Sequence, residues 1–204
     1  EKKYDVTALG ELLINFTMNG ESEQGNGMFE ACPGGAPCNV LAMLNKLGRK
    51  TAFMGKVGSD QFGRLLKETI EDAGIETKAL LLDEDVRTTL AFVHTFPDGD
   101  REFSFYRNPG ADMMLRAEEV DEELIRLVEK EHKLIVTMEE NVACGGFGEQ
   151  VLDYVSRIGG RAKVLNIALP DDYVEHGNVE LLRKEVGIDP LTIEKKILAS
   201  YIGL

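Results

Sequence analysis

Two adjacent glycines at the start of an expected helix are the residues best suited to holding a small ligand. Gly34 and Gly35 come just before Pro37, and proline is tolerated in the first turn of a helix. Glycines let a ligand approach the backbone closely, and the N-terminus of a helix offers free N–H donors to hydroxyls or anions. Asn39 can both donate and accept hydrogen bonds, which suits sugar hydroxyls. The two glycines fit a purely structural role in a tight turn equally well.

The elements that must position these residues follow from apolar spacing and helix-capping residues. Val40, Met43, Leu44 and Leu47 recur at the spacing of one helical face, so we predict a helix with an apolar face. The next apolar run, at residues 51–57, is expected to be a buried strand. Asp60 then has the position and chemistry of a cap for a second helix.

Further strands are expected on both sides of these helices. They lie at residues 4–9, 12–17, 88–96 and 101–107, with a polar, glycine-rich loop at residues 19–26. Residues 97–100 read Pro-Asp-Gly-Asp, so we expect the strands on either side of them to form a hairpin.

The second half of the chain continues the alternation of strands and helices. We predict strands at residues 134–138 and 164–169, and helices at residues 118–131, 146–158, 179–186 and 191–201. This alternation predicts the α/β class.

Composition narrows the classes of function. The chain has 204 residues, of which 43% are hydrophobic and 29% charged, an ordinary globular composition. Its net charge of −13 argues against a surface for nucleic acid or anionic membrane, because phosphate contacts need clustered lysine and arginine. No apolar run approaches the ~20 residues that span a bilayer, and the first residues lack the pattern of a signal peptide. We therefore expect a cytoplasmic protein that binds neither nucleic acid nor membrane.

The chain contains three cysteines, Cys32, Cys38 and Cys144, and their spacing matches no zinc pattern. An odd number also does not suggest a disulfide framework. We expect buried or half-buried free thiols and no metal site.

Three stretches in a fixed order carry a family resemblance: GELLIN at residues 10–15, PGGAPCN at residues 33–39 and GKVGSDQFG at residues 55–63. From about residue 4 to about residue 126 the chain resembles the N-terminal part of the ribokinase/PfkB family of sugar kinases, in particular bacterial fructokinases. The resemblance implies a ribokinase-like α/β portion at residues 1–126.

The resemblance also implies a sugar site. In that family, the residues that match Gly34, Gly35 and Asn39 contact the sugar. The strands at residues 12–17, 88–96 and 101–107 match a β lid over the sugar, which the family often uses for dimerisation. Arg107 matches a further sugar contact.

Two departures from the family argue against turnover. Fructokinases of this kind carry an aspartate where this chain has Asn15, and an amide accepts hydrogen bonds less strongly than a carboxylate. Sugar affinity should fall by roughly 1.5–3 kcal/mol. The family's ATP site and catalytic base lie in a later Gly-Ala-Gly-Asp region that this sequence lacks, since residues 108–112 resemble it only superficially. We therefore expect a kinase-derived protein with no catalytic residue.

The remaining part resembles a different family. HKLIVTMEENVACGGFGEQVLDYV at residues 132–155 and KVLNIALPDDYVEHGN at residues 163–178 resemble the C-terminal part of transketolase-like thiamine enzymes, specifically deoxyxylulose-phosphate synthase. The resemblance implies that residues 127–204 are a remnant of a three-layer transketolase C-terminal domain, which supports dimer packing. Kinases of the first family use ATP with Mg²⁺, and the synthases use thiamine diphosphate with Mg²⁺. We expect this chain to bind none of these cofactors.

Two side chains in this second part could do chemistry. Glu139 follows a strand and precedes a glycine pair, so it is expected to satisfy backbone donors at the start of the next helix. His176 could act as a general acid or base at neutral pH, but a structural role suits a lone loop histidine better.

The acidic segment at residues 121–126 suits both families, so we place a join between two unrelated proteins there. The helix at residues 118–131 would connect the two parts, whose strands could pair in one hybrid parallel sheet. Three functions stay open. They are a fructokinase-like transferase, a non-catalytic module that dimerises through the lid strands or the C-terminal portion, and a hybrid with no selected function. A small sugar and a second copy of the chain are the expected partners.

Overall fold

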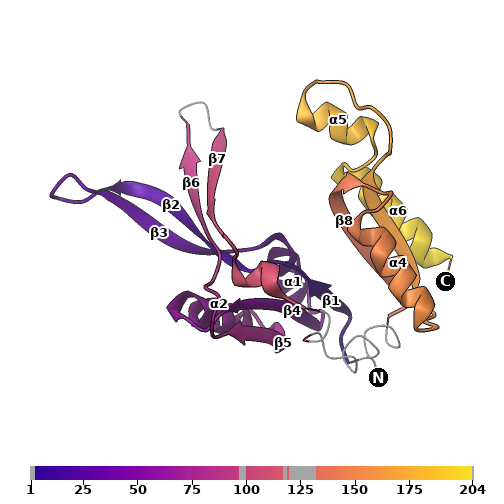
Figure 1. Cartoon of the computed structure of the whole chain (residues 1–204), viewed down its shortest axis with the longest axis horizontal. Helices are drawn as coiled ribbons and strands as arrows, with labels where there is room; N and C mark the ends of the chain where they lie inside the picture. Colours follow the sequence, from indigo (N-terminus) through magenta and orange to yellow (C-terminus); the bar gives the residue numbers. More distant parts are fainter. Residues whose placement is uncertain (1–2, 97–99, 117–118, 120–131, 204) are drawn as a thin grey trace. The chain divides into compact units, whose positions relative to one another are not determined.

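The fold divides into two compact units. The computed structural model describes residues 3–96, 100–116, 119 and 132–203. The first unit is Glu1–Leu124 and the second is Ile125–Leu204 (Figure 1). Among the described residues, no helix is long and apolar enough to cross a membrane. The expected helix at residues 118–131 and the expected join at residues 121–126 lie outside the described residues, except for Glu119.

The core of the first unit is a three-stranded parallel sheet. Its strand order is β1 (Val6–Leu9), β4 (Thr51–Gly58) and β5 (Glu76–Asp83). The helices α1 (Ala36–Lys46) and α2 (Gln61–Asp72) provide the crossovers and lie beside this sheet (Figure 1). Every residue of β4 is buried, as expected for a central parallel strand.

The two faces of β4 have different roles because successive side chains of a strand point to opposite faces. Phe53 and Val57 are almost completely buried in the hydrophobic core that α1 and α2 cover. Lys56 immediately precedes Val57, so its side chain points to the other face of the sheet. There its ammonium donates to the backbone oxygen of Met114, at the end of the short 3-10 helix η1 (Ala111–Met114). The sheet therefore has an apolar face under the helices and a charged contact on the other face.

The start of α2 confirms the expected cap. The Asp60 carboxylate accepts hydrogen bonds from the backbone N–H groups of Phe62 at 3.0 Å and Gly63 at 2.9 Å. The same carboxylate also accepts from the hydroxyl of Thr88 at 2.8 Å, at the start of the next strand region. Asp60 therefore joins the start of α2 to the segment that leads into β6.

The apolar face predicted for α1 is not the face that the core buries, and of its four residues only Leu44 is half-buried. Val40, Met43 and Leu47 are 56%, 58% and 69% exposed, whereas Cys38 and Leu41 are buried. The helix is apolar around much of its circumference, so spacing alone could not identify the stripe that packs on the sheet. The three-dimensional arrangement places Cys38 and Leu41 in the core.

A second sheet extends from this core (Figure 1). Its strand order is β3 (Gly27–Gly34), β2 (Leu13–Glu21), β6 (Leu90–Thr95) and β7 (Arg101–Tyr106), and we call it the lid sheet. β2 is antiparallel to β3 and parallel to β6, and β6 and β7 form the expected antiparallel hairpin. Phe16 of β2 contacts Phe62 of α2 edge to face, with ring centroids 5.6 Å apart, which connects the lid sheet to the core.

The sequence prediction missed β3 and β5 and placed a loop too early. β2 continues to Glu21, so the first three residues of the loop expected at residues 19–26 are strand, and the turn begins at Ser22. Both strands of this hairpin have exposed ends and a register shift between Met18 and Glu21. Exposed hairpin strands carry little apolar alternation, which explains why the sequence pattern did not reveal them.

Over residues 132–203, the part of the second unit that the structure describes, there are one small parallel sheet and three helices. β8 (Leu134–Val142) pairs with β9 (Lys163–Leu169), and the helices are α4 (Phe147–Arg157), α5 (Val179–Glu185) and α6 (Pro190–Ile202). The elements expected here are present, and most differ from the prediction by one residue at their ends. β8 is the exception, because it runs to Val142 and so contains Glu139, which was expected to follow the strand. The expected hybrid sheet is wrong, because within the described residues β8 and β9 pair with each other in a separate sheet.

Candidate functional site

The glycine pair occupies the junction between the lid sheet and α1. β3 ends at Gly34, and Gly35 is the N-cap of α1, with φ 130° and ψ 116°. Both glycines are buried. A Cβ atom on Gly35 would collide with the backbone oxygen of Glu11, and one on Gly34 would collide with the side chain of Asn15. Backbone packing and a positive φ therefore require glycine at position 35, whereas at position 34 an added Cβ would meet the movable end of the Asn15 side chain. The structural alternative is thus supported for Gly35.

The start of α1 has no side-chain cap. Gly35 has no side chain to supply one, Pro37 has no N–H, and the first turn contains no acidic residue. The backbone N–H of Asn39 donates to the oxygen of Gly35 at 3.1 Å, and the Asn39 residue is exposed. The amide of Asn39 is therefore available at a helix start whose partial positive charge is not offset by a carboxylate.

Asn15 lies directly beside the glycine pair. It is half-buried on β2, opposite Cys32 of β3, and its side chain is the group that a Cβ on Gly34 would strike. The structure thus brings Asn15, Gly34 and Gly35 together, although they are distant in sequence.

Arg107 follows the last lid strand and lies between two carboxylates. Its Nη2 atom is 3.3 Å from Glu11 Oε2, and it also pairs with Asp112. The Arg107 guanidinium carbon lies 5.4 Å from the ring centre of Phe105, and its side chain is 28% exposed. Within the described part of the chain, the buried Nε atom of Arg107 has no hydrogen-bond partner.

Glu11 connects Arg107 to the glycine pair. Its backbone oxygen packs against Gly35, and its carboxylate pairs with Arg107. Asn15, Gly34, Gly35, Glu11 and Arg107 therefore form one contiguous group, which we call the glycine-pair site. Asn39 lies on the helix that begins there.

The sequence analysis missed three residues that support this site. They are Glu11, Asp112 and Thr89, whose hydroxyl donates to Asp112. Glu11 lies inside the motif at residues 10–15, and Asp112 ends the segment at residues 108–112, so both were within recognised stretches. Asp112 is only five positions from Arg107. Glu11 is 96 positions from it, so the order of residues alone could not reveal that these two side chains meet.

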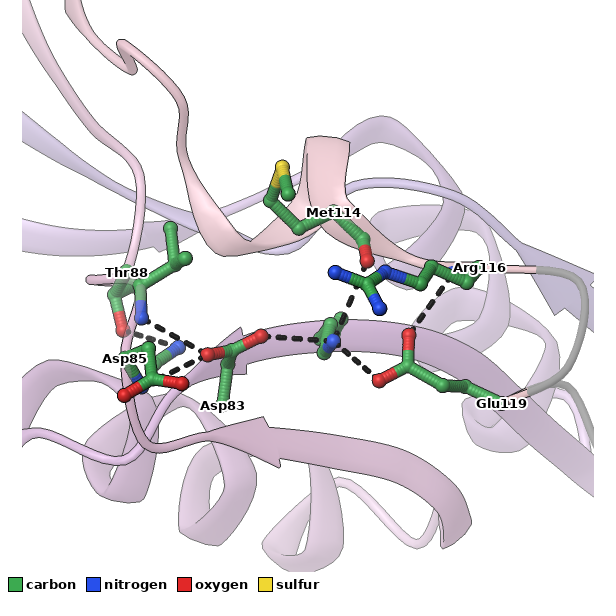
Figure 2. Close-up of polar contacts among 9 residues, drawn as sticks. Asp83, Asp85, Thr88, Met114, Arg116 and Glu119 are labelled. Atoms are coloured by element: carbon green, nitrogen blue, oxygen red, sulfur yellow. Dashed lines mark hydrogen bonds and ion pairs between the residues drawn. The ribbon is translucent and has the colours of Figure 1, made fainter.

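A second charged cluster lies on the far face of β4. The Lys56 side chain is 6% exposed, and its Nζ atom is 2.8 Å from Asp83 Oδ2 and 2.6 Å from Glu119 Oε1. It also donates to the backbone oxygen of Met114 at 3.3 Å. Figure 2 shows Asp83, Met114 and Glu119 converging on one point from β5, η1 and the turn beyond it.

The charges of this cluster stabilise one another. The hydrogen bond from Lys56 lowers the pKa of the Asp83 carboxyl to about 2. Burial by itself lowers the pKa of the Lys56 ammonium, but the hydrogen bonds to Asp83 and Glu119 outweigh burial and raise that pKa above its usual value. Both groups are therefore charged at neutral pH, and the cluster fastens β4, β5 and the segment after η1 together.

In the second unit, Glu139 has the expected structural role. Its two oxygens accept from the backbone N–H groups of Phe147 and Gly148, both at 2.8 Å. The carboxylate thus satisfies the first donors of α4, where an anionic ligand would otherwise bind. His176 is exposed in the segment before α5.

The three cysteines are free thiols with different surroundings. Cys38 is buried in the core, and burial raises the pKa of its thiol to about 12. Cys32 is half-buried, but Cys144 is exposed, so the expectation that all three are buried or half-buried is wrong for Cys144. Among the described residues, no three His, Cys, Asp or Glu side chains gather in a group that could hold a metal ion.

Known proteins provide an independent comparison. The family model of pfkB family carbohydrate kinases matches residues 3–172. Fructokinase-1 of Zea mays is 46% identical over 123 residues, which is 59% of this chain and 38% of the maize protein. The chain therefore spans well under half the length of this relative.

Solved structures share the fold. A fructokinase from Xylella fastidiosa matches 95% of this chain and 66% of its own, with a TM-score of 0.63 and 22% identity. A structure of fructokinase with bound ATP from Xylella fastidiosa matches 90% of this chain and 58% of its own, with a TM-score of 0.62 and 25% identity. These similarities support the predicted α/β ribokinase-like fold.

The match to the family model also bears on the expected second family. It continues to residue 172, well past residue 126, where the kinase-like portion was expected to end. These comparisons do not support a transketolase-like part at residues 127–204. Because the family model matches residues 3–172, most of the chain, this chain belongs to the pfkB family of carbohydrate kinases.

Proposed function

We propose that this chain is the sugar-binding portion of a fructokinase-like kinase, and that a fructose-like sugar binds at the glycine-pair site. The observation that carries the proposal is the packing of Asn15 against Gly34 and of Glu11 against Gly35, beside the paired guanidinium of Arg107. These groups offer donors and acceptors for several hydroxyls within one small region.

The start of α1 would supply the remaining contacts. Because no side chain caps this helix, its first N–H groups can donate to sugar oxygens. The exposed amide of Asn39 can donate and accept at the same place. The relatives named above are fructokinases, which favours a fructose-like ligand.

We infer that the chain by itself binds the sugar without phosphorylating it. Transfer of a phosphoryl group needs a base for the hydroxyl and preorganised donors for the developing charge. The chain covers 38% of the maize fructokinase, and its sequence contains no Gly-Ala-Gly-Asp motif. ATP is bound in the Xylella fastidiosa structure, but we expect no nucleotide site in this chain.

Calorimetric titration with D-fructose tests the binding proposal. Asn15→Asp restores a carboxylate acceptor beside Gly34, so we expect it to increase affinity by roughly tenfold or more, since a charge-assisted hydrogen bond contributes about 1.5–3 kcal/mol. Asn19→Asp is the matched control, because Asn19 lies exposed on the same strand. If Asn15→Asp shows no heat of binding at millimolar fructose while remaining folded, the site does not bind this sugar.

A coupled assay for ATP-dependent phosphorylation of fructose tests the absence of turnover. We expect no rate above background for the wild-type chain or for Asn15→Asp. A measurable rate that Gly35→Val removes would show that the chain contains a working phosphoryl-transfer site.

A second candidate function is that residues 127–204 form a non-catalytic module of separate origin. By its sequence, this module resembles the C-terminal part of deoxyxylulose-phosphate synthase. Two observations favour it. The identity to the maize protein runs over 123 residues, close to the 126 residues of the kinase-like portion, and the second compact unit begins at Ile125. Sequencing clonal DNA across codons 121–126 tests it. Separate full-length genes would identify an artificial join with no selected function, whereas one continuous gene would identify a genuine fusion.

A further inference from the structure

The charge around Arg107 is not balanced. Its guanidinium pairs with two carboxylates, those of Glu11 and Asp112. One positive and two negative formal charges leave this part of the glycine-pair site with an excess of one negative formal charge. The site therefore contains a cation but does not attract anions.

The two carboxylates differ in their freedom to move. The Asp112 side chain is 4% exposed and also accepts a hydrogen bond from Thr89, a buried residue at the start of β6. The Glu11 side chain is 39% exposed, and its contact with Arg107 is the longer one at 3.3 Å. Asp112 therefore holds the guanidinium in place from the interior, while Glu11 occupies the side that faces solvent.

An anionic ligand would meet Glu11 at this side. A carboxylate or phosphate that approached Arg107 would have to displace Glu11 or lie close to it, and repulsion between like charges that are partly desolvated weakens binding. A neutral sugar meets no such repulsion, because its hydroxyls can donate to Glu11 and accept from Arg107.

We propose that Glu11 is a specificity-determining residue which makes the glycine-pair site select uncharged keto sugars over the corresponding sugar acids. Asp112 is a positioning residue that fixes Arg107 for this purpose. The inference rests on the proposed sugar-binding function and adds the charge class of the ligand.

A matched pair of ligands provides the test. D-fructose and 2-keto-D-gluconate have the same carbon skeleton and stereochemistry, and they differ in carrying a hydroxymethyl group or a carboxylate at the first carbon. We measure the dissociation constant of each by calorimetry for the wild-type chain, for Glu11→Gln and for Glu68→Gln. Glu68 is exposed on α2, so its substitution changes the net charge equally without touching the site.

The expected result is a change in the ratio of the two affinities. Glu11→Gln should shift the ratio toward 2-keto-D-gluconate by roughly tenfold, because it removes one of two neighbouring negative charges. Glu68→Gln should leave the ratio as it is in the wild type. Added sodium chloride should narrow the preference of the wild type, since salt screens the repulsion of the acid.

The outcomes separate this inference from the function on which it rests. If Glu11→Gln gains no affinity for 2-keto-D-gluconate, the role of Glu11 is wrong, whatever fructose does. If neither the wild type nor Asn15→Asp binds fructose, the sugar site itself is wrong. A gain for the acid in Glu11→Gln would then still show that Glu11 excludes anions from Arg107.

Discussion

Gly35 combines two constraints in one residue. Its φ of 130° is a conformation that residues with side chains rarely adopt, and a Cβ there would strike the backbone of Glu11. The backbone of Glu11 belongs to the segment that leads into β2, so it has little room to move. Gly35 therefore lets the start of α1 lie directly against the backbone of Glu11, whose carboxylate pairs with Arg107.

We predict that Gly35→Ala lowers the free energy of unfolding by about 3 kcal/mol, because strain and a backbone collision add. Gly25→Ala is the control, since Gly25 has φ 78° but no atom within 4 Å of an added Cβ. It should cost only about 1 kcal/mol. Urea unfolding followed by circular dichroism measures both, as the chain has no tryptophan. Equal losses would mean that the contact with Glu11 is not limiting.

At the scale of elements, α1 shows that tertiary packing determines which face of an apolar helix is buried. Leu41 is 0% exposed in the core, whereas Met43 is 58% exposed only two positions later. Both are apolar, and the periodicity of the sequence fits either stripe. Contact with β1 and β4 decides between them.

The exposed face of α1 gives a direct prediction. Leu41→Ala should lower the free energy of unfolding by about 3 kcal/mol, because it creates a cavity in the core. Met43→Lys should change it by no more than about 0.5 kcal/mol, because its side chain already meets solvent. Urea unfolding distinguishes the two. A large loss for Met43→Lys would show that this face is covered in solution.

On the other face of β4, the second charged cluster, which consists of Lys56, Asp83, Glu119 and the Met114 backbone oxygen, holds neighbouring elements together. It connects β4 to β5 through Asp83 and reaches the segment after η1 through Met114 and Glu119. A buried lysine is tolerated only when its charge is paired and its donors are satisfied. The carboxylates of Asp83 and Glu119 favour the charged ammonium in this buried position, and the Met114 oxygen accepts a further hydrogen bond from it.

Acid should weaken this cluster in a predictable window. The pKa of Asp83 is about 2 in the folded chain against an ordinary value of 3.8, so its contribution is present above pH 3.8 and is lost as the pH falls toward 2. We predict that Asp83→Asn costs about 2 kcal/mol at pH 7, and that the difference from the wild type shrinks over this window. Urea unfolding at several pH values measures it. A difference that is independent of pH would contradict the assignment.

At the scale of the whole molecule, both units present apolar surface. Phe103 and Phe105 of the lid sheet are about half exposed, at 48% and 50%. In the second unit, α5 and α6 contain no buried residue, and Leu198 and Tyr201 are also about half exposed. Apolar patches of this kind are typical of surfaces that another chain covers.

We predict that the chain self-associates, because a second copy would cover this surface. Light scattering after size-exclusion chromatography measures its mass across a wide range of concentrations. Phe103→Glu tests the lid sheet and Leu198→Glu tests the second unit, and the surface that mediates association is the one whose substitution yields monomers. A monomer at every concentration would exclude self-association through either surface.

Several features of this protein could be predicted from the sequence by itself. Asp60 could be recognised as a helix cap, β4 as a buried strand, and Pro97 to Asp100 as the connection of a hairpin, because each depends on residues within a few positions of one another. The motif around Gly34 and Gly35 likewise identified the kinase family and the start of α1.

Only the tertiary structure decided the features that join distant residues. Arg107 and Glu11 are 96 positions apart, and no pattern in the chain records that their side chains meet. The same holds for Lys56 with Glu119, for the lid strand β3, and for the stripe of α1 that is buried. The order of residues determines local conformation. The pairing of charges and the face of a helix that is buried depend instead on which elements pack together. The free energy of the whole folded chain determines that packing.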